Sequence, residues 1–181
     1  MKINIPLATI LILSILLIIS VMVNKKSTNN VEINDELNRI MFNFDADKVT
    51  LYKFYSEGDN PINFRGLDYT HVGCINEVTN DTKSTCGETP KMLIGMFGNL
   101  MFNFTKGEIF KCEDVNTEKK IALKKYMQYF GMKSVYSKVL YNEMNMPVGG
   151  IVISHHIRPV KIDKFNYING SSEYLLVNAL E

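Results

Sequence analysis

The sequence predicts an α/β protein of the α+β type, in which an antiparallel sheet is flanked by helices and preceded by one transmembrane helix. Three observations lead to this prediction. An uncharged apolar stretch lies near the start of the chain, segments with period 2 then alternate with segments with period 3.6, and two strand-like segments near the end are joined by a short turn. A chain of 181 residues has room for one folded domain beside such a helix.

Composition excludes several classes of protein. Hydrophobic residues make up 46% of the chain and charged residues 22%, which argues against a disordered chain and against a protein with many membrane spans. The 20 Lys and Arg residues nearly balance the 19 Asp and Glu residues, giving a net charge of +1. Because nucleic-acid binding normally needs a clearly basic face, no nucleic-acid partner is expected.

The first predicted unit, residues 1–24, is a transmembrane signal anchor. Residues 5–23 carry no charge, and a helix of this length reaches roughly 28 Å, close to the hydrocarbon thickness of about 30 Å. No A-x-A-like cleavage site follows, which favours an anchor over a removed signal peptide. We therefore expect the lipid bilayer as a partner through residues 5–23, a span marked by Ile5, Leu11, Leu16 and Val23.

The orientation of this anchor is poorly determined by charge. Lys2 and the terminal amine on one side face Lys25 and Lys26 on the other, so the positive-inside rule nearly cancels. We expect a single-pass protein of a bacterial inner membrane with its folded domain on the periplasmic side. Residues Ala8, Ser14 and Ser20 do not form a small-xxx-small seam, so the helix resembles an anchor more than a packing interface.

The second predicted unit, residues 25–48, is a juxtamembrane helix. Asn29 and Glu32 have the spacing of a capping box, and an apolar stripe follows at three- and four-residue intervals. The stripe either packs on the folded domain or pairs with the same helix of a second subunit, so a homodimer stays open. Its members are Ile33, Leu37, Ile40, Met41 and Phe44.

The third predicted unit, residues 49–181, contains the sheet. The β-branched and aromatic content predicts strands, and apolar residues at helical spacing predict helices between them. Strands are expected at 49–55, 67–78, 107–115, 134–142 and 149–156, with helices starting at Pro90, ending at Gly131, and covering 171–180. The lysines beside the second helix are expected to be solvated, with contact to anionic lipid near the anchor as the alternative: Lys120, Lys124 and Lys125.

Cysteine and histidine patterns do not predict a catalytic or metal site. Cys74, Cys86 and Cys112 lack paired C-x-x-C clips, so buried thiols are the simplest interpretation, with one disulfide and one free thiol as the alternative. Adjacent His155 and His156 in a strand point to opposite faces and are poorly placed to chelate one ion. We expect no enzyme activity, no metal and no cofactor.

Several short motifs resemble GAF domains. Residues 131–134 (GMKS) lead into a strand, and residues 147–153 (PVGGIVI) form the next strand after a short turn, as in the C-terminal half of that family. Residues 54–58 (FYSEG), 74–78 (CINEV) and Pro90 are similar to a GAF-like group of phages and bacteria. The resemblance covers residues 49–156 and implies a GAF-like sensory or interaction module that binds a small ligand or a protein, or dimerises.

A ligand pocket is expected where these motifs and strand ends meet. Glu77 and Asp114 lie near strand ends, and flexible thioethers on the methionine-rich helix suit an adaptable wall. The candidate pocket residues are Phe54, Cys74, Glu77, Met96 and Asp114.

A second resemblance concerns the architecture of the whole chain. Holins of T-even-like phages have one N-terminal membrane helix followed by a small α/β domain, and the Asn, Lys and Ile usage suits a phage gene. The sequence therefore predicts a membrane-anchored GAF-like sensory module without catalytic activity, with a phage holin or lysis-timing regulator as the alternative.

Overall fold

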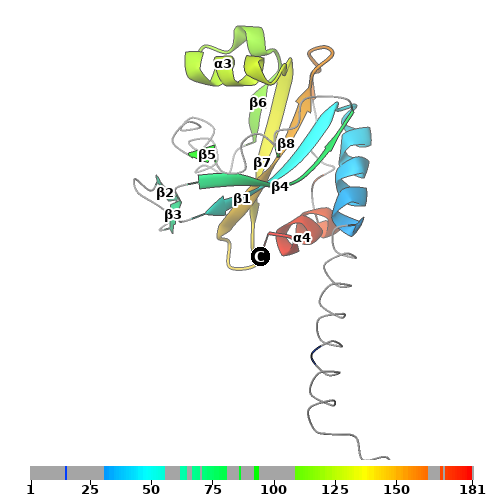
Figure 1. Ribbon diagram of the computed structural model, residues 1–181, viewed down its shortest axis with the longest axis vertical. Helices are drawn as coiled ribbons and strands as arrows, with labels where there is room; N and C mark the ends of the chain where they lie inside the picture. Colours follow the sequence, from blue (N-terminus) through cyan, green and yellow to red (C-terminus); the bar gives the residue numbers. More distant parts are fainter. Residues whose placement is uncertain are drawn as a thin grey trace, which may run out of the picture.

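The computed structural model describes residues 31–55, 62–64, 67–69, 71–80, 92–93, 109–162 and 170–180, together with Ile15, Cys86 and Ile168. Its centre is a six-stranded antiparallel sheet in the order β5-β4-β1-β8-β7-β6 (Figure 1). The strands are β1 (Lys48–Tyr55), β4 (His71–Thr79), β5 (Met92–Leu93), β6 (Phe110–Cys112), β7 (Ser134–Tyr141) and β8 (Pro147–His155). A separate antiparallel pair consists of β2 (Ile62–Phe64) and β3 (Leu67–Tyr69).

The predicted antiparallel sheet with helices is confirmed, and so is the hairpin of the last two strands. Two expectations about its edge are wrong. The strand expected at 67–78 is divided into β3 and β4, and the helix expected from Pro90 is replaced at Met92 and Leu93 by β5, which pairs with His71 and Val72. A short apolar segment is compatible with a strand as well as with a helix. Here β5 forms because the backbone of β4 offers it hydrogen-bonding groups at the edge of the sheet. The other residues of the methionine-rich helix predicted from Pro90 lie outside the described residues.

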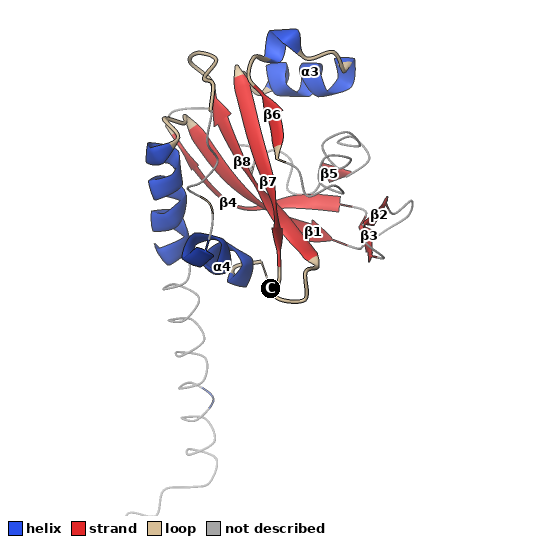
Figure 2. Cartoon of the chain, turned by 180° about the vertical axis from the view of Figure 1, so that it is seen from behind, coloured by secondary structure: helices blue, strands red, loops and turns tan. Residues whose placement is uncertain are grey.

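One face of the sheet is covered by two helices, residues 31–43 and α4 (Gly170–Asn178) (Figures 1 and 2). We call it the apolar face, because its inward side chains are nearly all aliphatic or aromatic. Gly149 brings α4 close, since a Cβ there would lie 2.7 Å from Cδ1 of Leu180 and 2.1 Å from the carbonyl oxygen of Tyr52. The strand residues of the apolar face are Val49, Leu51, Tyr136, Leu140, Ile151 and Ile153.

The helix of residues 31–43 packs on its own domain through the predicted stripe. Ile33, Leu37 and Ile40 are buried in the same core as the apolar face, which answers the open question of where this stripe packs. Arg39 hydrogen-bonds Glu36 at 2.6 and 2.8 Å and thereby lowers the pKa of Glu36, and Ser172 of α4 also donates to this carboxylate. The stripe therefore packs inside the domain and is not exposed for pairing with a second subunit.

The opposite face carries a second core near α3 (Ile121–Tyr129) and the 3-10 turn η2 (Val115–Thr117). Gly131, at a φ of 71°, ends α3 as predicted, with the Met132 N–H donating to the Met127 carbonyl at 2.9 Å. The strand expected at 107–115 is shorter, because Asp114 caps η2 instead of extending β6. This core contains Phe110, Cys112, Val115, Leu123, Met127, Phe130, Met132 and Val135.

The predicted membrane span falls almost entirely outside the described residues. Within residues 5–23 only Ile15 is described, and it is helical and about half exposed at 49%. In the part of the chain that the structure describes, no helix combines the length and the apolar character needed to cross a bilayer.

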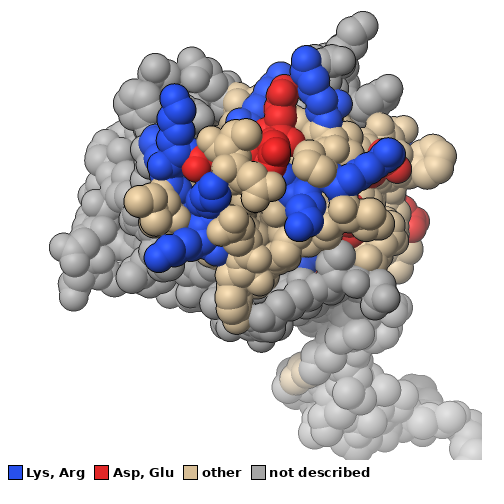
Figure 3. Space-filling view, turned by 90° about the horizontal axis from the view of Figure 1, so that it is seen from above, with Lys and Arg blue, Asp and Glu red and all other residues tan. Residues whose placement is uncertain are grey.

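Lysines gather at the end of the domain that carries α3 (Figure 3). This end lies away from residue 31, where the described part of the first helix begins (Figure 1). Of the three lysines expected to be solvated, Lys120 and Lys125 are exposed, whereas Lys124 is half-buried and its ammonium donates to the Asn116 carbonyl. The exposed members are Lys111, Lys119, Lys120, Lys125 and Lys133.

Candidate functional site

The sheet face opposite the apolar face carries a row of buried polar side chains, and we call it the polar face. Alternation along each strand sends Val49 and Leu51 to one side and Lys48, Thr50 and Tyr52 to the other. The cross-strand register then places further polar residues on the same side. The polar set of this face consists of Lys48, Thr50, Tyr52, Glu77, Ser137 and Ser154.

A buried ion pair lies at the centre of the polar face. The side chains of Lys48 and Glu77 are 1% and 5% exposed, and Nζ of Lys48 lies 3.8 Å from Oε2 of Glu77. The Thr50 hydroxyl donates to the same oxygen at 3.2 Å. Removing charges from water is costly, so this pair is expected to respond strongly to the loss of either partner.

A β-bulge brings Cys74 and Glu77 to the same face. The register pairs Leu51 with Asn76 and Tyr52 with Cys74, so Ile75 has no partner on β1. Without the bulge, residues three apart in a strand would point to opposite faces. The extra residue therefore places the Cys74 side chain beside Glu77.

Two tyrosines connect the polar face to α3. The pKa of Tyr126 is raised mainly by burial. The neighbouring Tyr52 hydroxyl, which is hydrogen-bonded to Tyr126, raises it further. Tyr126 therefore stays protonated at neutral pH and can hold α3 against β1 as a neutral hydrogen-bonding group.

Ser137 is the unpartnered member of the polar face. Its side chain is fully buried, and its Oγ has no hydrogen-bond partner among the residues that the structure describes. A buried hydroxyl left unpaired costs roughly 1–3 kcal/mol. Native structures keep few such groups, so one at the centre of a sheet face requires an explanation.

The two adjacent histidines have separate environments, as the strand alternation predicts. His155 is buried between the Phe44 carbonyl, 3.0 Å from Nε2, and the Ser134 hydroxyl, 3.0 Å from Nδ1. Because a carbonyl only accepts, Nε2 of His155 carries a proton. His156 contacts the Ser154 hydroxyl at 3.0 Å, and burial, followed by nearby Lys48, lowers the pKa of His156.

The expectation of three buried thiols is wrong for two of the three cysteines. Cys74 and Cys86 form a disulfide, and Cys112 is a free, buried thiol. Burial, with smaller contributions from Glu118 and Asp114, raises the pKa of the Cys112 thiol to about 11. Cys112 is therefore a poor nucleophile at neutral pH, in keeping with the structural role expected for it.

Of the five predicted pocket residues, the structure brings two together. Cys74 and Glu77 are neighbours on the polar face, and buried Phe54 lies on the same face but further along β1, opposite Val72. Asp114 lies beyond edge strand β6 and caps η2, with its Oδ1 accepting from the Asn116 N–H at 2.9 Å. Met96 lies outside the described residues.

Sequence reasoning missed Lys48, Thr50, Tyr52, Tyr126 and Ser137. The first three share one parity in a strand that was expected nearly where β1 occurs, so period-2 alternation could have placed them on one face. Tyr126 falls at helical spacing with the apolar residues Leu123, Met127 and Phe130, a pattern that predicts a core position rather than a polar one. No sequence signal indicates that the hydroxyl of Ser137 has no partner.

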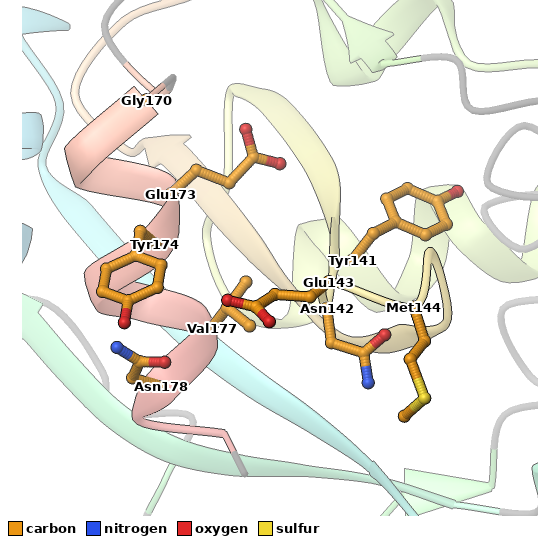
Figure 4. Close-up of a pocket in the computed structure, with 9 residues that line it drawn as sticks. All are labelled: Tyr141, Asn142, Glu143, Met144, Gly170, Glu173, Tyr174, Val177 and Asn178. Carbon is orange, nitrogen blue, oxygen red and sulfur yellow. The ribbon is translucent and has the colours of Figure 1, made fainter.

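A separate groove lies between α4 and the turn that joins β7 to β8 (Figure 4). Its volume is about 610 Å³, and side chains from the turn and from α4 line its two sides. Glu173 at its rim is already paired with Lys138 at 2.8 Å. The lining residues are Tyr141, Asn142, Glu143, Met144, Gly170, Glu173, Tyr174, Val177 and Asn178.

Comparison with known proteins identifies the fold. No family model matches the sequence, and no curated protein gives a significant match. Solved structures do match. The GAF domain region of a Geobacter sulfurreducens protein, described as a membrane protein, aligns with a TM-score of 0.62 at 13% identity, covering 88% of this chain and 97% of that chain.

Two cyanobacterial photoreceptor domains give similar results. The blue-light-absorbing PixJ GAF domain of Thermosynechococcus elongatus aligns with a TM-score of 0.63 at 10% identity, over 84% of this chain and 86% of that one. A phycocyanobilin-bound GAF domain from a cyanobacterial phytochrome aligns with a TM-score of 0.60 at 15% identity, over 92% and 90%. The fold is GAF-like. The predicted GAF resemblance is thus confirmed for the fold. At such low sequence identities the matches show the fold alone and not the function.

Proposed function

We propose that this protein is a membrane-anchored GAF-like sensory module that binds a small ligand against its polar face and has no catalytic activity. The unpartnered, fully buried hydroxyl of Ser137 is the observation that carries the proposal. A ligand group that hydrogen-bonds this hydroxyl would offset its cost, and the Lys48–Glu77 pair lies on the same face, with β8 and its residue Val152 between Ser137 and Thr50.

The structural neighbours support a binding role for this fold. One of them is a GAF domain with bound phycocyanobilin, so the architecture can hold a small organic molecule. For this chain we propose a polar ligand rather than a purely apolar one, because the polar face combines a cation, a carboxylate, hydroxyls and phenols in its interior.

Ligand binding is tested by thermal unfolding of the full-length protein in detergent with a panel of small metabolites. We expect at least one compound to raise the melting temperature of the wild-type protein and of Tyr174→Ser, a groove variant, but much less that of Ser137→Val. A shift that survives Ser137→Val and is lost in Tyr174→Ser would assign the ligand to the groove and overturn the proposal for the polar face.

We also propose that residues 5–23 anchor the protein in a bacterial inner membrane with the folded domain in the periplasm. The uncharged span supports the anchor. The Cys74–Cys86 disulfide supports the orientation, because disulfides persist in oxidising compartments. A reporter active only in the periplasm, fused after Glu181, is expected to be active; activity of a cytoplasmic reporter instead would reverse the orientation.

A phage holin or lysis-timing regulator has the same overall architecture and is the competing function. The two differ in what the span must do, because a sensor needs it for attachment while a holin needs its particular helix packing in lipid. We expect that replacing residues 5–23 with an unrelated apolar span leaves localisation and ligand binding intact. Abrupt permeabilisation of cells by the natural span but not by the replacement would favour lysis.

A further inference from the structure

Three metal-binding side chains converge at the edge of the polar face. The two sulfurs of Cys74 and Cys86 and a carboxylate oxygen of Glu77 all lie within 4.8 Å of one another. As whole residues all three are intermediate in burial, and the Glu77 side chain itself is 5% exposed. The β-bulge at Ile75 creates this convergence, because it turns Cys74 to the side of Glu77.

The geometry fits a tetrahedral transition metal once the two sulfurs are thiolates. Zinc binds sulfur at about 2.3 Å and carboxylate oxygen at about 2.0–2.2 Å, so neighbouring ligand atoms in a tetrahedral site lie roughly 3.4–3.8 Å apart. The carboxylate oxygen already lies within 4.8 Å of both sulfurs, whereas the two sulfurs are bonded to each other and must move apart after reduction to reach this range. Glu77 can contribute because one of its carboxylate oxygens lies within 4.8 Å of both sulfurs, and a bound metal would share this carboxylate with Lys48 and Thr50, which contact Oε2.

We propose that Cys74, Cys86 and Glu77 form a redox-gated site for a thiophilic divalent cation of the zinc class. In the oxidised protein the disulfide occupies both sulfurs and excludes the metal. Reduction adds two electrons and two protons to the sulfur–sulfur bond and yields two thiols. Metal binding then releases both thiol protons, and the three protein ligands leave one tetrahedral position for water. This inference does not depend on the small ligand proposed above.

Charge favours the metal over the existing contacts in the reduced state. The ammonium of Lys48 lies 3.8 Å from Glu77 and opposes a nearby cation. Two thiolates and one carboxylate supply three negative charges, which balance one ammonium and one divalent cation only when all three ligands take part. The site should therefore depend on Glu77 as well as on the cysteines.

The test uses full-length protein in detergent, reduced with a phosphine that takes its oxygen from water and becomes a phosphine oxide. Cd²⁺ is the probe, because cadmium–thiolate bonds have an ultraviolet charge-transfer band, and Zn²⁺ is then added as a competitor. We expect one Cd²⁺ per reduced chain, no band in the oxidised protein, and loss of the band in Cys74→Ser and Cys86→Ser.

The carboxylate is tested with matched variants that keep both thiols. Glu77→Gln is expected to weaken Cd²⁺ binding by about tenfold or more, since even residues behind the ligands contribute about that much. Cys112→Ser and Glu113→Gln, which lie outside the cluster, are expected to bind like the wild type. The proposal is overturned if the reduced wild type shows no band, if either single-cysteine variant retains full binding, or if Glu77→Gln binds as tightly as Glu113→Gln.

Discussion

The two faces of the sheet are built from the same strands but bury different kinds of side chain. On the apolar face, the helix of residues 31–43 and α4 bury aliphatic side chains against β1, β7 and β8. On the polar face, the same strands bury Lys48, Thr50 and Ser137. The polar face also has an apolar core near α3, and beside this core it carries buried polar groups that cost stability. The apolar face is therefore mainly structural, and the polar face is the one for which we propose binding.

The largest expected effect comes from breaking the Lys48–Glu77 pair. Glu77→Leu leaves a buried ammonium without its carboxylate, and we expect a loss of about 3–5 kcal/mol. The double variant Lys48→Met/Glu77→Leu removes both charges and should recover most of the loss. Urea unfolding of the full-length protein in detergent measures both values. A double variant as unstable as the single one would show that the pair itself stabilises the fold.

The apolar face should respond to truncation of its core. Leu37 is on the helix of residues 31–43 and is fully buried in the core of the apolar face, so Leu37→Ala is expected to cost about 2–5 kcal/mol through lost burial and the cavity left behind. Phe42 on the same helix is 86% exposed, and Phe42→Ala should change stability by less than about 0.5 kcal/mol. Equal losses in the two variants would contradict the packing of this helix.

The disulfide at the edge of the polar face is expected to contribute less. It closes a sequence separation of 12 residues, and the chain-entropy model gives about 3 kcal/mol for loops near this length. The double variant Cys74→Ala/Cys86→Ala should lose roughly this amount under oxidising conditions and nothing under reducing conditions relative to the reduced wild type. Cys112→Ala is the control: it keeps the Cys74–Cys86 disulfide, so added reductant should lower its stability by about as much as it lowers that of the wild type.

Sequence patterns were sufficient wherever a short segment determines its own structure. The hairpin of β7 and β8, the end of α3 at Gly131 and the stripe of Ile33, Leu37 and Ile40 all follow from local periodicity and turn chemistry. α4 also begins within one residue of the position expected from sequence.

The missed features depend on pairing between distant segments. The bulge at Ile75 exists only in the register with β1, and it determines which face Cys74 occupies. Alternation can assign Lys48 to a face, but it cannot reveal that this face is covered. Asp114 was expected near the other pocket residues, yet strand order places β6 at the edge opposite β4 and β5.

Stability of the polar face should also depend on pH through His156. Its pKa is lowered in the folded protein, mainly by burial and secondarily by Lys48, with Asp47 acting in the opposite direction. The unfolded chain therefore binds more protons below the ordinary pKa of 6.5, so stability falls as the pH decreases through this value. We expect His156→Gln to flatten this dependence in urea unfolding at pH 5 to 7. An unchanged slope would assign the dependence to other groups.

The smallest change is expected from the most informative pair of substitutions, Ser134→Ala and Ser137→Ala. Both serines lie on β7 and are fully buried, but only Ser134 has partners: its Oγ contacts His155 and accepts the Val160 N–H at 3.1 Å. Ser134→Ala should cost about 1–3 kcal/mol, because it leaves two buried groups unpaired.

Ser137→Ala removes a hydroxyl that has no partner, so without ligand its stability should be unchanged or higher by up to about 1 kcal/mol. The order reverses for binding: a compound that stabilises the wild type through the polar face should stabilise Ser134→Ala normally and Ser137→Ala less. Unfolding curves with and without the compound measure both effects. If Ser137→Ala destabilised the free protein as much as Ser134→Ala, the Ser137 hydroxyl would already be satisfied by the chain, and the distinction between a structural and a binding face would fail at its central residue.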